Sequence, residues 1–178
     1  TSAPIQDTSA PIQTAPQLQP THNLLSWKDC SGLSYLSSLE SDEMARLTGG
    51  CAKLTFCKRG LNYDDHLFGY MMDDGSNDCL SPGPVIRMEP GKTYGLVLCS
   101  DGDGDENHPG TNIHTHGLHI SGSGNSDDIT RWVAKDSCGF YEYKIPADHM
   151  GGTNWFHPHM HQRTLEQAAG GAFGLLII

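Results

Sequence analysis

The chain has 178 residues, enough for one domain with a well-buried core and short for two. Its formal net charge of −10 argues against nucleic acids and anionic membrane surfaces as partners. No stretch approaches the roughly 20 apolar residues that a membrane-spanning helix needs. With 21 glycines, 10 prolines and only 37% hydrophobic residues, the composition favours a β-rich fold of short strands over a helical bundle.

The N-terminal part has two regions of different character. Residues 1–21 contain an imperfect repeat rich in Pro, Ser, Thr and Gln, which predicts a flexible, low-complexity arm. Residues 22–52 are expected to form a helical or irregular extension, because apolar side chains recur at helical spacing within 33–48. Ser41 is the expected N-cap, and the glycines at 49 and 50 would end the helix.

From residue 53 onward the pattern changes to short strands separated by turn residues. We expect a cupredoxin domain over 53–178, an all-β, Greek-key β-sandwich of antiparallel strands. The acidic, glycine-rich segment 101–110 is interpreted as a solvated loop, because its spacing fits no EF-hand calcium loop. The expected strands are 54–57, 85–88, 93–98, 112–120, 140–145, 153–157 and 173–178.

The six cysteines form an even, scattered set without a CxxC pair. Such a set favours disulfides and therefore a secreted or extracytoplasmic protein, although free buried thiols in a cytosolic protein are the alternative. Six cysteines allow 15 connectivities, which the sequence does not separate. The residues are Cys30, Cys51, Cys57, Cys79, Cys99 and Cys138.

Two histidine pairs are the main functional signal. His114 and His116 form one HxH pair, and His157 and His159 form a second about forty residues later. Residues i and i+2 of a strand project from the same face, so each pair presents two imidazoles side by side. Two such strands brought together would gather four imidazoles, which suit Cu, Zn, Fe or Ni. The sequence therefore predicts a metal site.

The flanks of these pairs resemble a known family, the multicopper oxidases, in both the laccase-like and the copper-efflux-type branches. The match covers the first cupredoxin domain of the family only, well over about 80–178 and loosely over 50–80. The segments that carry it are 82–87, 90–91, 111–120 (TNIHTHGLHI), 141–149 (YEYKIPADH), 152–161 (GTNWFHPHMH) and 170–178.

The resemblance implies that the chain supplies four of the eight histidines of a trinuclear copper cluster. Carried over by motif, His114 would bind the type 2 copper, and His116, His157 and His159 would bind the type 3 pair. Asp127 stands where the family often has an acid that delivers protons during O2 reduction, although a solvated loop acid is the alternative.

Neighbouring residues of the two motifs also receive expectations. His161 is expected to support the cluster without binding its metals, and His119 to be structural or exposed. Gly117 is expected to permit close packing of the backbone beside the site.

The family's type 1 copper site, a Cys between two His, has no counterpart in this sequence. The parent activity, oxidation of small reducing substrates coupled to O2 reduction to water, would therefore need the remaining cupredoxin domains. The chain is then a piece of a longer oxidase, a stand-alone domain for copper storage or transfer, or one half of a homodimer that shares eight histidines. A zinc hydrolase is the alternative from another class, but no clear carboxylate ligand stands near the pairs.

Overall fold

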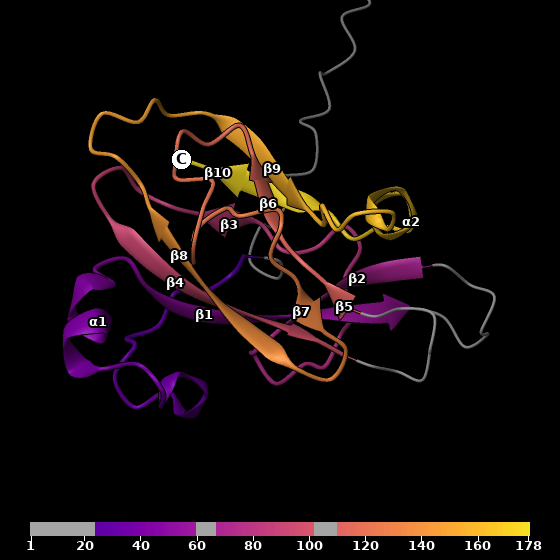
Figure 1. Cartoon of the computed structure of the whole chain (residues 1–178), viewed down its shortest axis with the longest axis horizontal. Helices are drawn as coiled ribbons and strands as arrows, with labels where there is room; N and C mark the ends of the chain where they lie inside the picture. Colours follow the sequence, from indigo (N-terminus) through magenta and orange to yellow (C-terminus); the bar gives the residue numbers. More distant parts are fainter. Residues whose placement is uncertain (1–23, 60–66, 102–109) are drawn as a thin grey trace, which may run out of the picture.

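The computed structural model describes residues 24–59, 67–101 and 110–178, and it shows a β-sandwich (Figure 1). One sheet has the strand order β2-β1-β4-β8, and the other has the order β3-β10-β9-β6. The predicted arm over 1–21 and all but the two ends of the predicted acidic loop lie outside the described residues.

The strands are short, as the composition indicates, and only β1 and β4 reach eight residues or more. A small two-stranded sheet of β5 and β7 completes the fold. The bounds are β1 Gly50–Arg59, β2 Leu67–Met72, β3 Ile86–Arg87, β4 Thr93–Ser100, β5 Gly110–Thr111, β6 His114–His116, β7 Val133–Ala134, β8 Cys138–Lys144, β9 Thr153–His157 and β10 Gly174–Ile177.

The all-β, cupredoxin-like class is confirmed, but the expectation of an antiparallel sandwich is wrong in one respect. Each four-stranded sheet contains one parallel pair, β1 with β4 and β3 with β10. Parallel neighbours need a long connection, and more than thirty residues separate β1 from β4 along the chain. The remaining neighbours in the two sheets are antiparallel.

The hydrophobic core lies between the two sheets and is rich in aromatic side chains. Because side chains alternate across a strand, every second residue of β8 and β9 turns inward. Each fully buried side chain of this size stabilises the fold by about 2 kcal/mol relative to an exposed one. The largest of these side chains include Tyr70, Tyr141, Tyr143, Phe68 and Phe156.

The N-terminal extension contains the predicted short helices, a 3-10 turn at Ser34–Leu36 and α1 at Ser41–Arg46. The N-cap is Glu40 rather than Ser41, because the Glu43 carboxylate accepts the Glu40 backbone N–H at 3.0 Å.

All six cysteines are paired, which confirms the predicted disulfides. The bonds are Cys30–Cys51, Cys57–Cys79 and Cys99–Cys138. The first ties the extension to β1, and the last joins facing positions of β4 and β8. Within the described residues, no helix is long and apolar enough to cross a membrane.

Four elements were not predicted, and one predicted strand is shorter than expected. The strands β2, β5 and β7 were missed, as was helix α2 at Thr164–Ala169. Within the expected strand over 112–120 only β6 forms, and it ends before Gly117. Gly117 adopts a φ of 94°, a left-handed conformation that ends the strand directly after the first histidine pair.

Candidate metal centre

Strands β6 and β9 lie side by side and antiparallel, which brings the two histidine motifs together. His114 faces His157 in the register, and His116 faces Trp155. Between them, the facing pair Thr115 and Phe156 is buried in the core. Because successive side chains point to opposite faces, the histidines occupy the outer face of the sheet.

Three imidazoles meet closely enough to share one metal ion. Ligand atoms of His114, His116 and His157 all lie within 4.8 Å of one another. The ring centroids of His114 and His157 are 5.3 Å apart, and those of His114 and His116 are 5.7 Å apart. The structure thus brings the predicted pairs into one cluster.

His159 joins this group from beyond the end of β9 rather than from within the strand. Its ring centroid lies 5.2 Å from that of His114 and 5.9 Å from that of His157. Strand alternation therefore does not place this side chain. Instead, its backbone N–H donates to Oδ1 of Asn112 at 2.6 Å.

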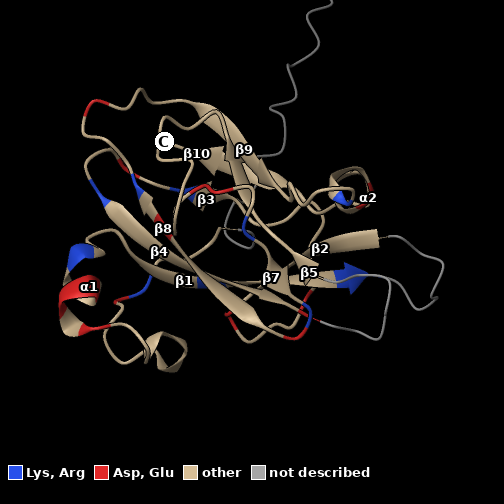
Figure 2. Cartoon of the chain, viewed as in Figure 1, with Lys and Arg blue, Asp and Glu red and all other residues tan. Residues whose placement is uncertain are grey.

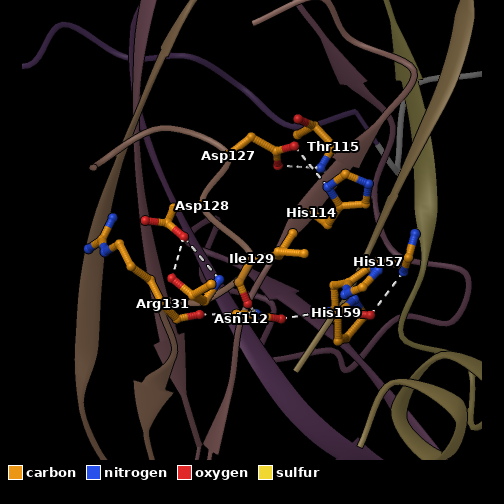
Figure 3. A network of polar contacts seen from close by, with 11 residues as sticks. Asn112, His114, Thr115, Asp127, Asp128, Ile129, Arg131, His157 and His159 are labelled. Atoms are coloured by element: carbon orange, nitrogen blue, oxygen red, sulfur yellow. Dashed lines mark hydrogen bonds and ion pairs between the residues drawn. The ribbon is translucent and has the colours of Figure 1, made fainter. Parts of the chain in front are cut away.

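In two of the imidazoles, a hydrogen bond determines which ring nitrogen carries the proton (Figure 3). Nδ1 of His114 lies 2.8 Å from Oδ2 of Asp127, and Nδ1 of His157 lies 2.9 Å from the carbonyl oxygen of Pro158. Since both oxygens accept, each Nδ1 carries a proton, and in the neutral imidazole Nε2 then keeps a free lone pair. Nε2 of His157 is buried and has no hydrogen-bond partner among the described residues.

Burial also favours the metal-binding form of His157. Desolvation lowers the pKa of its imidazole, and the neighbouring imidazoles of His114, His159 and His116 lower it further. A lowered pKa keeps the ring neutral near pH 7, and only the neutral ring offers a lone pair to a metal.

Apolar side chains of β9 and β10 lie beside the cluster on the outer face of the sheet. Trp155 stacks on His157 with ring centroids 4.1 Å apart and lies 5.3 Å from His116. Trp155 and Leu175 face each other on β9 and β10, and both are about 40% exposed. Figure 2 shows no Lys, Arg, Asp or Glu on β9 or β10.

A groove of about 610 Å³ runs beside His159, on the side of α2. Exposed Trp132 and Ile129 line it together with His161. His161 lies past the end of β9, so the strand parity that it shares with His157 in the sequence does not direct it to the cluster.

The other predicted residues have defined positions. Asp127 contacts His114 directly, and its second oxygen accepts the Thr115 backbone N–H at 2.7 Å. His119 is exposed, as expected, and its backbone N–H donates to Nε2 of His149 at 3.1 Å. A Cβ at Gly117 would collide with Oδ1 of Asn154, which agrees with the close packing expected there.

Asn112 and Trp155 are the two residues near the cluster that the sequence reasoning did not assign. Both lie inside the recognised motifs, two residues before His114 and two before His157. Their position beside the histidine pairs is the sequence feature that could have indicated a role at the site.

The fold and the histidine cluster define a cupredoxin-like domain. A sequence model of the multicopper oxidase family matches residues 77–178, more than half of the chain. The chain belongs to the multicopper oxidase family.

Solved multicopper oxidases share the fold. A multi-copper oxidase from Pediococcus acidilactici is 24% identical over 72% of this chain, with a TM-score of 0.53. The McoA multicopper oxidase from Aquifex aeolicus is 24% identical over 74%, with a TM-score of 0.54. The laccase-like multi-copper oxidase CueO from Ochrobactrum sp. is 26% identical over 71%, with a TM-score of 0.50. This chain spans 25%, 27% and 26% of those proteins, respectively.

Proposed function

We propose that the four histidines bind copper and form this domain's half of a type 2/type 3 trinuclear cluster. The observation that carries the proposal is the free Nε2 of His157, a buried lone pair without a partner beside two other imidazoles. A buried polar atom without a partner costs about 1–3 kcal/mol, and a bound metal ion would remove that cost. Membership of the multicopper oxidase family makes copper the expected metal.

The donor set fits copper, although the ligands alone do not separate copper from zinc. Within the described residues, the cluster that could hold a metal consists of imidazoles alone. Both oxygens of Asp127 are occupied by His114 and Thr115, so Asp127 is not a free ligand. Neutral imidazoles suit both copper and zinc, and three of them with a water can form a catalytic zinc site, so the family membership of the chain is what favours copper.

The protein's own residues orient the ligands. Asp127 and the Pro158 carbonyl hold protons on Nδ1 of His114 and His157, so that each Nε2 faces the cluster. Trp155 covers one side of His157 and restricts water there. Bound copper would supply the redox chemistry that reduces O2 to water, with electrons from small reducing substrates oxidised at a type 1 site outside this chain.

In this proposal, the copper cluster needs further ligands from a second domain. His116 and Trp155 remain exposed on the outer face of the second sheet. Since the chain spans about a quarter of the solved oxidases, we propose that another cupredoxin domain covers this face and adds the remaining ligands. We further propose that the cupredoxin unit consists of residues 53–178 together with the first residues of β1, which begins at Gly50. We also propose that the three disulfides place the protein outside the cytoplasm.

Copper titration of the 178-residue chain, followed by electron paramagnetic resonance and metal counting, tests the proposal. We expect bound Cu(II) with a type 2 signal that disappears in His114→Ala. The matched control is His119→Ala, which alters an exposed histidine of the same segment and should leave copper binding unchanged. Unchanged copper binding in a quadruple variant of His114, His116, His157 and His159 would contradict the proposal.

Sedimentation of the copper-loaded chain separates the possible partners. A monomer that binds copper incompletely supports a second, different domain. A dimer that forms only with copper, at about three ions per pair, would instead show that two copies complete the site.

A further inference from the structure

Asn112 has a buried side chain that makes three hydrogen bonds to two separate segments around the cluster. It is fully buried, between β5 and β6. Its Oδ1 accepts the His159 backbone N–H at 2.6 Å. Its Nδ2 donates to the carbonyl oxygens of Ile129 and Arg131, at 2.9 Å and 3.0 Å. One amide group therefore joins the chain at His159 to the loop that follows Asp127 (Figure 3).

This loop is also fixed at its other end by the histidine cluster. Asp127 lies two residues before Ile129 and bonds His114 and the Thr115 backbone. The loop thus contacts the site through the Asp127 carboxylate and is held against Asn112 through its main-chain carbonyls.

We propose that Asn112 is a positioning residue that sets the relative placement of His159 and the Asp127–His114 pair. His159 needs such a restraint because β9 ends at His157, so no strand pairing holds its backbone. The inference rests on the proposed metal function of the four histidines. Substitution of a residue that hydrogen-bonds to a metal ligand, without binding the metal itself, typically lowers metal affinity about 10–100-fold.

The chemistry of the position requires an amide. The His159 N–H needs an acceptor, and the two loop carbonyls need donors, so the two ends of the side chain must differ. Asn112→Asp retains an acceptor for the His159 N–H but removes the two N–H donors that face the loop. Asn112→Leu has a similar volume and removes all three bonds.

Gln167 provides a matched control. Its amide, in α2, is also fully buried, donates to the Gly110 carbonyl at 2.9 Å and lies 3.2 Å from Oγ1 of Thr111. It belongs to the same region but has no hydrogen bond to a histidine or to the 121–131 loop in the described part of the chain. Gln167→Met should therefore lower the melting temperature without altering the cluster.

The experiment compares the full chain with Asn112→Asp, Asn112→Leu and Gln167→Met by two measurements. The first is the imidazole Nδ1 proton resonance of His114 in the metal-free protein, which reports its bond to Asp127. The second is the dissociation constant for Cu(II). We expect the resonance to shift or broaden in both Asn112 variants, with Cu(II) binding weakened about tenfold or more. Gln167→Met should match the wild type in both.

The two variants and two readouts keep the outcomes distinct. If Asn112→Leu fails to fold, Asn112→Asp still provides the comparison. A folded Asn112→Asp protein with wild-type resonance and affinity would overturn the proposal, as would an equal effect of Gln167→Met. If the wild-type chain binds no Cu(II), the proposed function fails, whereas the resonance comparison still decides the role of Asn112.

Discussion

Oδ2 of Asp127 lies 2.8 Å from Nδ1 of His114, and the other oxygen of the same carboxylate accepts the Thr115 backbone N–H. Both oxygens are therefore used to orient the first histidine motif. This contact explains why an acid is useful at this position even before any metal binds. The sequence-based role of Asp127 in proton delivery stays a prediction, and its role in orienting His114 can be tested separately.

Asp127→Asn should weaken copper binding while the fold is retained. The Asn amide can donate to Nδ1 of His114, which would move the imidazole proton to Nε2 and block the atom that faces the cluster. Loss of such a carboxylate typically reduces metal affinity about 10–100-fold. Equilibrium titration with Cu(II) measures the change.

Asp128→Asn is the matched control for that substitution. Asp128 is the next residue, but its carboxylate accepts the backbone N–H and the hydroxyl of Thr130 and not a histidine N–H. We expect wild-type copper affinity for Asp128→Asn. Equal affinities for Asp127→Asn and the wild type would show that the carboxylate does not control the tautomer of His114.

Gly117→Ala should destabilise the protein more than Gly124→Ala. Both glycines have positive φ, 94° and 67°, so an alanine at either position is strained by about 1 kcal/mol. A Cβ at Gly117 would also collide with Asn154, whereas the space around Gly124 is open within 4 Å. Chemical denaturation should show an additional loss of about 1–2 kcal/mol for Gly117→Ala. Equal losses would mean that Asn154 moves aside without cost.

The histidine cluster was predictable because its information is local. The first HxH pair follows strand alternation, and the flanks of both pairs carry the family resemblance. His159 and Asn112 show the limit of that reasoning. The chain leaves β9 at His157, and a side-chain amide 47 residues away positions His159. Spacing in a sequence does not reveal a contact between segments that meet only after folding.

The fold was predictable at the level of its class, and less so in its connections. Strand β9 has the predicted bounds because Thr153–His157 lies between a glycine pair and a proline. Helix α2 was missed because its six residues contain only one large apolar side chain, and that residue, Leu165, is exposed. The parallel pairing of β1 with β4 depends on tertiary packing, which local patterns do not encode.

Copper binding should quench the fluorescence of Trp155. Its ring stacks on His157 at 4.1 Å and lies 5.3 Å from His116, so Cu(II) held by these imidazoles would be close to the indole. The wild-type chain and a Trp132→Phe variant should both lose Trp155 emission on titration, and Trp155→Phe should lose most of that response. Strong quenching that persists in Trp155→Phe would place the bound copper elsewhere.

Removal of the Cys30–Cys51 disulfide should destabilise the fold without changing copper affinity. The bond holds the N-terminal extension against β1, in the sheet that does not carry the histidines. A disulfide that closes a loop of this length typically contributes about 3 kcal/mol. A Cys30→Ser/Cys51→Ser variant should therefore unfold at lower denaturant concentration. A large change in copper affinity at a temperature where the variant is folded would contradict the separation of the two regions.

Two buried tyrosines should limit stability in alkali. The hydroxyls of Tyr70 and Tyr143 are fully buried and have no hydrogen-bond partner within the described residues. Burial raises the pKa of both phenols above its ordinary value. Below about pH 10 the phenols are protonated in both the folded and the unfolded chain, so they add no pH dependence there. Above it the unfolded chain releases protons that the folded chain retains, so the free energy of unfolding falls as the pH rises.

The Tyr70→Phe/Tyr143→Phe variant tests this argument because it keeps both rings and removes both hydroxyls. At pH 7 it should be as stable as the wild type or more stable, by up to about 1 kcal/mol for each unpartnered hydroxyl removed. Between pH 10 and 11 it should lose less stability than the wild type, as measured by denaturant unfolding at each pH. If the free energy of unfolding fell equally with pH in both proteins, ionisable groups other than these two phenols would govern unfolding in alkali.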